Sequence, residues 1–146
     1  MSDFRVLLVE DNPADVFLVE EALRENQVPY KLARFESGED ALAALDRGIH
    51  WENSVAAAPD IVVLDLNTPR MDGLEFLRIV REKPQLRQIP IAVLTSSQSP
   101  ADRRDANALG AACFIRKPAR LQQFLSEVGI SLKSLLEGKR AEIHEN

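Results

Sequence analysis

Short apolar runs recur along the chain, and each is followed by a segment in which apolar residues repeat at helical spacing. The first run covers residues 5–9, and Val16, Val19 and Leu23 repeat after it. A short continuous apolar run is typical of a strand buried on both faces, whereas a 3.6-residue repeat is typical of an amphipathic helix. The pair of patterns recurs four more times, with strands expected at 30–35, 61–64, 89–94 and 112–115.

Residues that favour helix ends mark the boundaries of the predicted helices. N-caps are predicted at Asn12, Ser37 and Ser99. Gly110 predicts a left-handed helix end. The last helix is expected to run for roughly 18 residues from Arg120, with a bend at Gly129.

Five strands that alternate with five helices predict one doubly wound α/β domain, with a parallel sheet covered by helices on both faces. We expect the strand order 2-1-3-4-5 and a single domain over residues 1–146, with its packed core at about 5–137. The charged tail 138–146 is expected to fray. The connection 48–59 is longer than most loops in such folds.

Composition narrows the class of protein. The chain has 146 residues and a formal net charge of −5, which argues against direct DNA binding. Cys113 is the only cysteine, so no disulfide forms within the chain. Because the sequence shows neither a membrane-spanning apolar run nor a signal peptide at its start, we expect a cytoplasmic protein without a membrane partner.

Polar residues follow the predicted strands at the points where these strands end. They are Glu10 and Asp11 after the first strand, Asp65 after the third, Thr95 after the fourth and Lys117 after the fifth. Ligands of open parallel sheets bind at the carboxyl ends of the strands. With strands one and three as neighbours, the three carboxylates are expected to lie close together.

Three like charges at close range need a counter-charge, and a divalent cation is the natural one. Mg²⁺ prefers hard oxygen ligands and keeps several of its waters. We expect Asp11 and Asp65 as direct ligands, Glu10 as a ligand through water, and the backbone carbonyl of Asn67 as a further ligand.

An aspartate carboxylate beside Mg²⁺ is able to attack phosphorus and form an aspartyl phosphate. Asp65 is the best placed candidate for this role. Phosphoryl transfer depends on neutralising the charge of the transferred oxygens. Lys117 supplies a positive charge for this purpose, and the Thr95 hydroxyl supplies a hydrogen-bond donor.

The segments VLLVEDN, IVVLDLNTPRMDG, VLTS and FIRKP resemble the signature of the receiver domain of two-component response regulators. This resemblance implies a flavodoxin-like (βα)5 fold. It also implies that Glu10, Asp11 and Asp65 bind Mg²⁺, that a histidine kinase phosphorylates Asp65, and that Thr95 and Lys117 contact the phosphoryl group. Such a protein catalyses only its own phosphorylation and dephosphorylation, and signals by changing the face that binds its downstream partner.

The resemblance implies four further features. Thr95 and Phe114 form the switch pair, although Phe114 lacks the hydroxyl that many members carry at this position. The peptide bond between Lys117 and Pro118 is expected to be cis. The opening VEDNPADVFLVEEAL and the 48–59 connection resemble regulators that are paired with phytochrome-type histidine kinases. A homodimer through the fourth and fifth helices and the fifth strand is expected.

Two other functions remain open at this stage. A Mg²⁺-dependent phosphohydrolase of the haloacid dehalogenase type also uses an aspartate at a strand end, a hydroxyl and a lysine. Its second acid is missing here, because position 67 is asparagine. The third possibility is a receiver-like scaffold that is never phosphorylated, which the presence of every acceptor residue disfavours.

Overall fold

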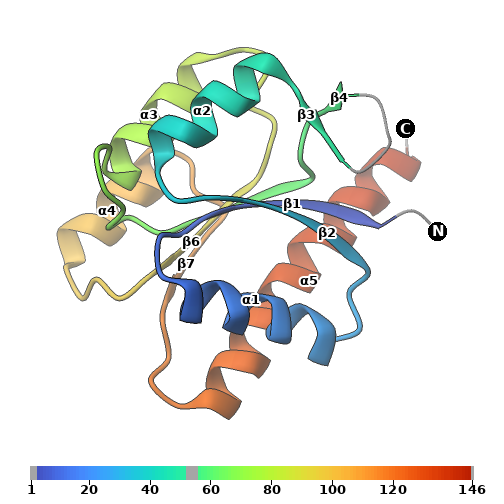
Figure 1. Ribbon diagram of the computed structural model, residues 1–146, viewed down its shortest axis with the longest axis vertical. Coiled ribbons are helices and arrows are strands. Elements are labelled where there is room, and N and C mark those ends of the chain that lie inside the picture. Colours follow the sequence, from blue (N-terminus) through green and yellow to red (C-terminus); the bar gives the residue numbers. More distant parts are fainter. Residues whose placement is uncertain (1–2, 52–55, 146) are drawn as a thin grey trace.

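The computed structural model describes residues 3–51 and 56–145. Its main sheet has five parallel strands in the order β2-β1-β5-β6-β7, as the sequence predicts (Figure 1). The strands of this sheet are β1 (Phe4–Val9), β2 (Tyr30–Phe35), β5 (Ile61–Leu64), β6 (Ile91–Thr95) and β7 (Cys113–Arg116). The helices are α1 (Pro13–Glu25), α2 (Gly38–Arg47), α3 (Gly73–Glu82), α4 (Pro100–Ala108) and α5 (Leu121–Glu145).

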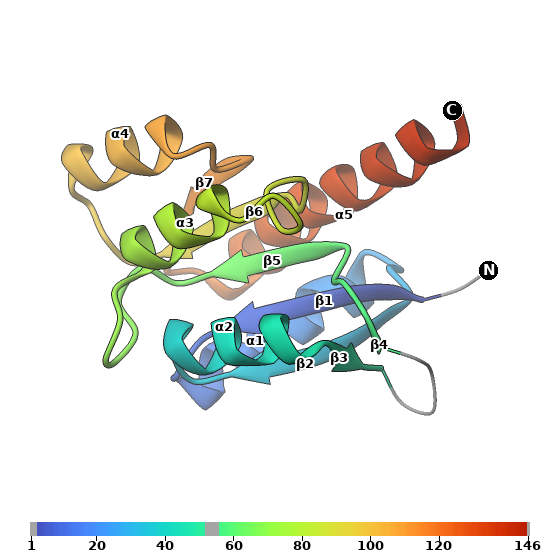
Figure 2. The ribbon, with the colours of Figure 1, turned by 90° about the horizontal axis from the view of Figure 1, so that it is seen from above.

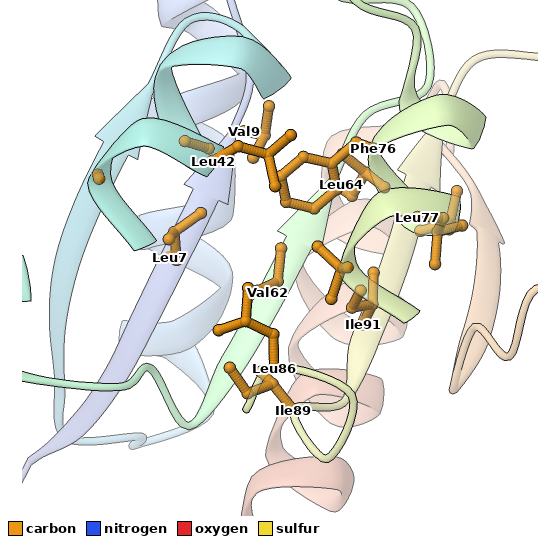
Figure 3. Close-up of a cluster of buried hydrophobic side chains, with 14 of the residues drawn as sticks. Leu7, Val9, Leu42, Val62, Leu64, Phe76, Leu77, Leu86, Ile89 and Ile91 are labelled. Carbon is orange, nitrogen blue, oxygen red and sulfur yellow. The ribbon is translucent and has the colours of Figure 1, made fainter. Parts of the chain in front are cut away.

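Helices cover both faces of the sheet, with α1 and α5 on one face and α2, α3 and α4 on the other (Figure 1). Successive side chains of a strand point to opposite faces, so the central strands feed two separate cores. In Figure 3, for example, Leu7 and Val9 of β1 face Leu42 of α2 and Phe76 of α3. Both faces of β1 are therefore buried, which explains its continuous apolar run.

The predicted N-caps are confirmed by side-chain hydrogen bonds at the first turns of the helices. Asn12 Oδ1 accepts from the Ala14 N–H at 2.9 Å, and Ser37 Oγ accepts from the Asp40 N–H at 3.2 Å. The Asn12 cap matters most for function, because it starts α1 directly after the acidic pair that ends β1. Gly110 has φ +85°, as expected for a left-handed helix end.

Part of the long connection 48–59 is ordered. Strand β3 (Ile49–His50) pairs antiparallel with β4 (Ala56–Ala57) and forms a small second sheet. The buried Trp51 donates its indole N–H to the Ala57 carbonyl at 3.1 Å. The remainder of the predicted connection at 52–55 lies outside the described residues.

The charged tail is helical in the structure, because α5 continues to Glu145. Glutamate, lysine, arginine and alanine all have high helix propensity, so the composition that suggested disorder also favours a helix. Lys139 Nζ donates to the Asp60 carbonyl at 3.2 Å and ties this part of α5 to the start of β5. The helix projects beyond the strands (Figure 2). None of the helices in the described part of the chain combines the length and the hydrophobicity of a transmembrane segment.

Candidate functional site

The carboxyl ends of β1 and β5 bring three acidic residues together, as the strand order predicts. Glu10, Asp11 and Asp65 each offer one carboxylate oxygen, and these oxygens lie within 4.8 Å of one another. Glu10 and Asp65 are buried, with 2% and 6% of their surface exposed, whereas Asp11 is exposed. Three carboxylates this close repel one another unless a cation lies among them.

Backbone hydrogen bonds continue the strand ladders as far as these acids. The Glu10 N–H donates to the Phe35 carbonyl at 2.9 Å, and the Asp65 N–H donates to the Val9 carbonyl at 3.1 Å. Two N–H groups also contact the carboxylates directly. Asn12 N–H donates to Glu10 Oε2 at 3.2 Å, and Asn67 N–H donates to Asp65 Oδ1 at 3.1 Å. The sheet and the two following turns therefore fix the positions of both carboxylates.

The Lys117 ammonium lies among the carboxylates, as expected from its place after β7. Its Nζ is 2.7 Å from Glu10 Oε1, 2.7 Å from Asp15 Oδ2 and 3.2 Å from Asp65 Oδ2. Burial lowers the pKa of Lys117, but hydrogen bonds to Asp15 and Glu10, together with the negative charges of Asp65 and Glu10, outweigh that effect and raise the pKa above its usual value. The side chain therefore stays charged at neutral pH.

Burial also acts on Glu10, in the opposite direction. The pKa of the Glu10 carboxyl is raised to about 7, first by burial and also by the nearby charge of Asp65. The hydrogen bond from Lys117 lowers this pKa and offsets part of the rise. A second cation near Glu10 would favour its ionised form in the same way.

Two site residues, Asp15 and Arg34, are missing from the sequence prediction. Asp15 lies in the first turn of α1, and its carboxylate binds Lys117. Arg34 of β2 donates from Nε to the Glu10 carbonyl at 2.9 Å and from Nη2 to the Asp11 carbonyl at 3.1 Å. The acid in the first turn after an acidic pair is a signal that could have pointed to Asp15. No comparable signal marks Arg34.

The Thr95 hydroxyl lies at the same edge and is fully buried. Its Oγ1 accepts from Asn67 Nδ2 at 3.4 Å and from the Ser97 N–H at 3.2 Å. The Lys117 N–H donates to the Thr95 carbonyl at 2.7 Å. Asn67 thus contacts Asp65 through its backbone and Thr95 through its side chain, which links the acidic cluster to the end of β6.

The chemistry of these donors fits a divalent cation. All three residues offer carboxylate oxygens, which are the hard ligands that such cations prefer, and their oxygens are close enough to share one ion. Lys117 occupies two of the same carboxylates and leaves Asp11 without its contact. The cluster is therefore an acidic metal site with a lysine at its side.

Comparison with known proteins assigns this arrangement to a family. The model of the "Response regulator receiver domain" family matches residues 6–129 of the chain. The chain belongs to this family. The receiver domain is similar to the response regulator Rcp1 of Synechocystis, with 35% identity over 123 residues that cover 84% of this chain and 82% of Rcp1.

Solved structures agree with this assignment. The receiver domain is similar to the phosphorylated cyanobacterial phytochrome response regulator RcpA, with a TM-score of 0.82, 35% identity, and coverage of 92% of this chain and 95% of RcpA. It is also similar to the Mn²⁺-bound form of Rcp1, with a TM-score of 0.80, 34% identity, and coverage of 92% and 95%. Because the chain belongs to the receiver family, it is not a member of the haloacid dehalogenase family.

Phe114, the predicted partner of Thr95, lies on the same face of the sheet of this receiver domain. It pairs with Val93, two residues before Thr95 in β6, and is half-buried. The Arg103 guanidinium of α4 lies 5.2 Å from the centre of the Phe114 ring and donates to the Phe114 carbonyl at 3.3 Å. The Phe114 ring thus has a cation over its face.

The prediction of a cis bond between Lys117 and Pro118 is wrong, because the described residues contain no cis peptide bond. The trans form is the lower in energy by about 0.5–1 kcal/mol at an X–Pro bond. With this bond in the trans form, the Lys117 N–H still reaches the Thr95 carbonyl and its Nζ still reaches the acidic cluster.

Proposed function

We propose that this receiver domain accepts a phosphoryl group on Asp65 from a histidine kinase in a Mg²⁺-dependent reaction. One observation carries the proposal. The buried Asp65 carboxylate lies in one cluster with two further acids and has the Lys117 ammonium 3.2 Å from its Oδ2. A carboxylate nucleophile, a metal site and a cation for the transferred oxygens are the parts that phosphoryl transfer requires.

In the proposed reaction, an Asp65 carboxylate oxygen forms a bond to phosphorus while the bond from phosphorus to the kinase histidine nitrogen breaks. Lys117 moves its ammonium from the carboxylates to an oxygen of the new phosphoryl group, over a short distance because it already touches Asp65. The Thr95 hydroxyl donates to a second phosphoryl oxygen. Both contacts stabilise the negative charge of the transferred group.

We propose Mg²⁺ as the divalent cation of the acidic site, with Asp11 and Asp65 as direct ligands. Glu10 contributes through water, and Asn67 contributes its backbone carbonyl. When bound, Mg²⁺ neutralises negative charge on the phosphoryl oxygens. Support comes from the all-oxygen donor set and from the similarity to an Mn²⁺-bound regulator.

Incubation with acetyl phosphate and Mg²⁺ tests the proposal. We expect a gain of one phosphoryl group in the intact mass, no gain with a chelator present, and localisation of the group to the peptide that contains Asp65. The modification is expected to stop at one phosphoryl group, because Asp65 is the single proposed acceptor. A protein that stays unmodified with saturating Mg²⁺ would be a scaffold, and steady phosphate release from a small phosphomonoester would indicate a phosphohydrolase.

We further propose that Thr95 and Phe114 transmit the modification to the partner-binding face. When the Thr95 hydroxyl turns toward the phosphoryl group, it releases space beside β7, and the Phe114 ring moves into that space. The common face of the two side chains and the half-buried state of Phe114 support this step.

We propose a phytochrome-type histidine kinase as the phosphodonor, because the chain is similar to two cyanobacterial phytochrome response regulators. A phosphorylated phytochrome-type kinase is expected to label the protein at least about tenfold faster than an unrelated histidine kinase, since cognate pairs differ in binding free energy. Transfer is measured as the rate at which the labelled phosphoryl group appears on the receiver domain. The Asp65→Asn variant, which lacks the proposed acceptor, gives the background. Equal rates from both kinases would contradict the assignment.

We also propose a homodimer through α4, α5 and β7. Strand β7 is at the edge of the sheet, and Ile130 of α5 is 59% exposed. Light scattering with Mg²⁺ and beryllofluoride is expected to give the mass of a dimer, and Ile130→Lys is expected to return it to a monomer. Phe17→Lys is the matched control, because Phe17 of α1 is also 59% exposed. A monomer under all conditions would contradict this proposal.

A further inference from the structure

The Lys117 ammonium has one carboxylate partner that is not a member of the metal cluster. Its three partners are Glu10, Asp15 and Asp65, whereas the metal cluster consists of Glu10, Asp11 and Asp65. Two of the three partners of Lys117 are thus shared with the cation, and Asp15 is the third. The contact to Asp15 is as short as that to Glu10, at 2.7 Å.

Helix α1 places Asp15 for this contact. Asn12 caps the helix directly after the acidic pair, so the first turn of α1 lies beside the metal cluster. Lys117 approaches from the end of β7 and is only 12% exposed, while Asp15 is 21% exposed. The Lys117 ammonium therefore links Asp15 of α1 to Glu10 and Asp65 of the acidic cluster.

We infer that Asp15 is a positioning residue that holds Lys117 when a divalent cation binds the cluster of Glu10, Asp11 and Asp65. Without Asp15, a cation that shares Glu10 and Asp65 with Lys117 would weaken both remaining ion pairs of a nearly buried ammonium, which is unfavourable. With Asp15, the ammonium keeps one short ion pair at the rim of the site. Asp15 thus strengthens cation binding without being a ligand.

The inference rests on the proposed function, because it takes Mg²⁺ as the cation, and a double-mutant cycle on Mg²⁺ affinity tests it. Isothermal titration with Mg²⁺ is expected to show that Asp15→Asn binds Mg²⁺ about fivefold more weakly than the wild type. In a Lys117→Met background the same substitution is expected to change the affinity less than about twofold, because the lysine through which Asp15 acts is gone. Asp15→Glu is expected to restore most of the affinity.

Glu21→Gln is the matched control, because Glu21 is on the same helix and pairs with Arg24. It is expected to leave Mg²⁺ affinity unchanged. An equal loss from Asp15→Asn in both backgrounds would show that Asp15 acts by its own charge, and no loss in either would show that it has no role; both results overturn the inference. If Lys117→Met does not fold by circular dichroism, Lys117→Gln takes its place in the cycle.

The two proposals fail in different ways. A wild-type protein that binds no Mg²⁺ would overturn the proposed function together with its metal site. A wild-type protein that binds Mg²⁺ and is phosphorylated, but shows no coupling between positions 15 and 117, would overturn only the role of Asp15.

Discussion

The Asp65→Asn variant is expected to accept no phosphoryl group from acetyl phosphate, while its metal-free fold becomes more stable. The amide of asparagine is not a nucleophile toward phosphorus, so the reaction has no acceptor. The substitution also removes one negative charge from a cluster of carboxylates, and the nearby charge of Asp65 raises the Glu10 pKa. We expect the free energy of unfolding to rise by about 1 kcal/mol without Mg²⁺.

Asp60→Asn is the matched control for this variant. Asp60 precedes the same strand, β5, at its opposite end, and its Oδ2 accepts from the Arg5 N–H at 2.7 Å. Asparagine keeps an oxygen that accepts this hydrogen bond, so phosphorylation of the control is expected at the wild-type rate. Intact mass reports the modification, and urea denaturation with a chelator reports stability. An Asp65→Asn protein that still gains a full equivalent of phosphate would exclude Asp65 as the acceptor.

The opposite signs of the two effects follow from the architecture of the site. Strands β1 and β5 carry buried acids to the same edge because their register and hydrophobic faces are fixed by the cores on both sides of the sheet. The repulsion between these acids is a cost in the metal-free fold. The same closeness supplies a metal site and a nucleophile when a cation is present.

The strand-end residues could be predicted because only the topology is needed to place them. The apolar runs place each acid at the end of a strand, and the order 2-1-3-4-5 of a doubly wound sheet brings Glu10, Asp11 and Asp65 to one edge with Lys117 beside them. Helix starts were equally predictable, since Asn12 or Ser37 acts through a hydrogen bond to its own first turn. The first contact depends on topology, and the second depends on a local pattern.

Other features depend on how far a side chain extends or on small energy differences. The order of apolar and polar residues gives no information on either. Arg34 is one residue before the end of β2, and only its conformation in the folded chain carries the guanidinium to the carbonyls of Glu10 and Asp11. The choice between cis and trans at Pro118 depends on about 1 kcal/mol. The hairpin after α2 has strands of two residues each, too short for any alternation to appear.

A glycine within a helix, such as Gly129, is compatible either with a bend or with a close contact to another helix, and the sequence alone does not distinguish the two. A glycine within a helix predicts a weak point and a bend. The structure gives another reason for it: a Cβ at position 129 would lie 2.6 Å from the Ala22 carbonyl oxygen of α1 and would clash with Asn26 Nδ2. Glycine therefore permits the close approach of α5 to the end of α1.

The Gly129→Ala variant is expected to lower the free energy of unfolding by about 3 kcal/mol, because the helices must separate to admit the methyl group. Asn26 Nδ2 donates to the Ala22 carbonyl at 2.8 Å and to the Leu125 carbonyl at 3.0 Å, and the clash displaces it from both. The loss of these hydrogen bonds adds to the strain and outweighs the gain of about 1 kcal/mol that alanine brings in helix propensity.

Gly138→Ala separates the two contributions, because a Cβ at position 138 of the same helix meets nothing within 4 Å. Only helix propensity acts there, so this variant is expected to be more stable than the wild type by up to about 1 kcal/mol. Urea denaturation of both variants beside the wild type makes the comparison. If Gly129→Ala were as stable as Gly138→Ala, α1 and α5 would tolerate a methyl group at their contact, and glycine there would reflect no packing requirement.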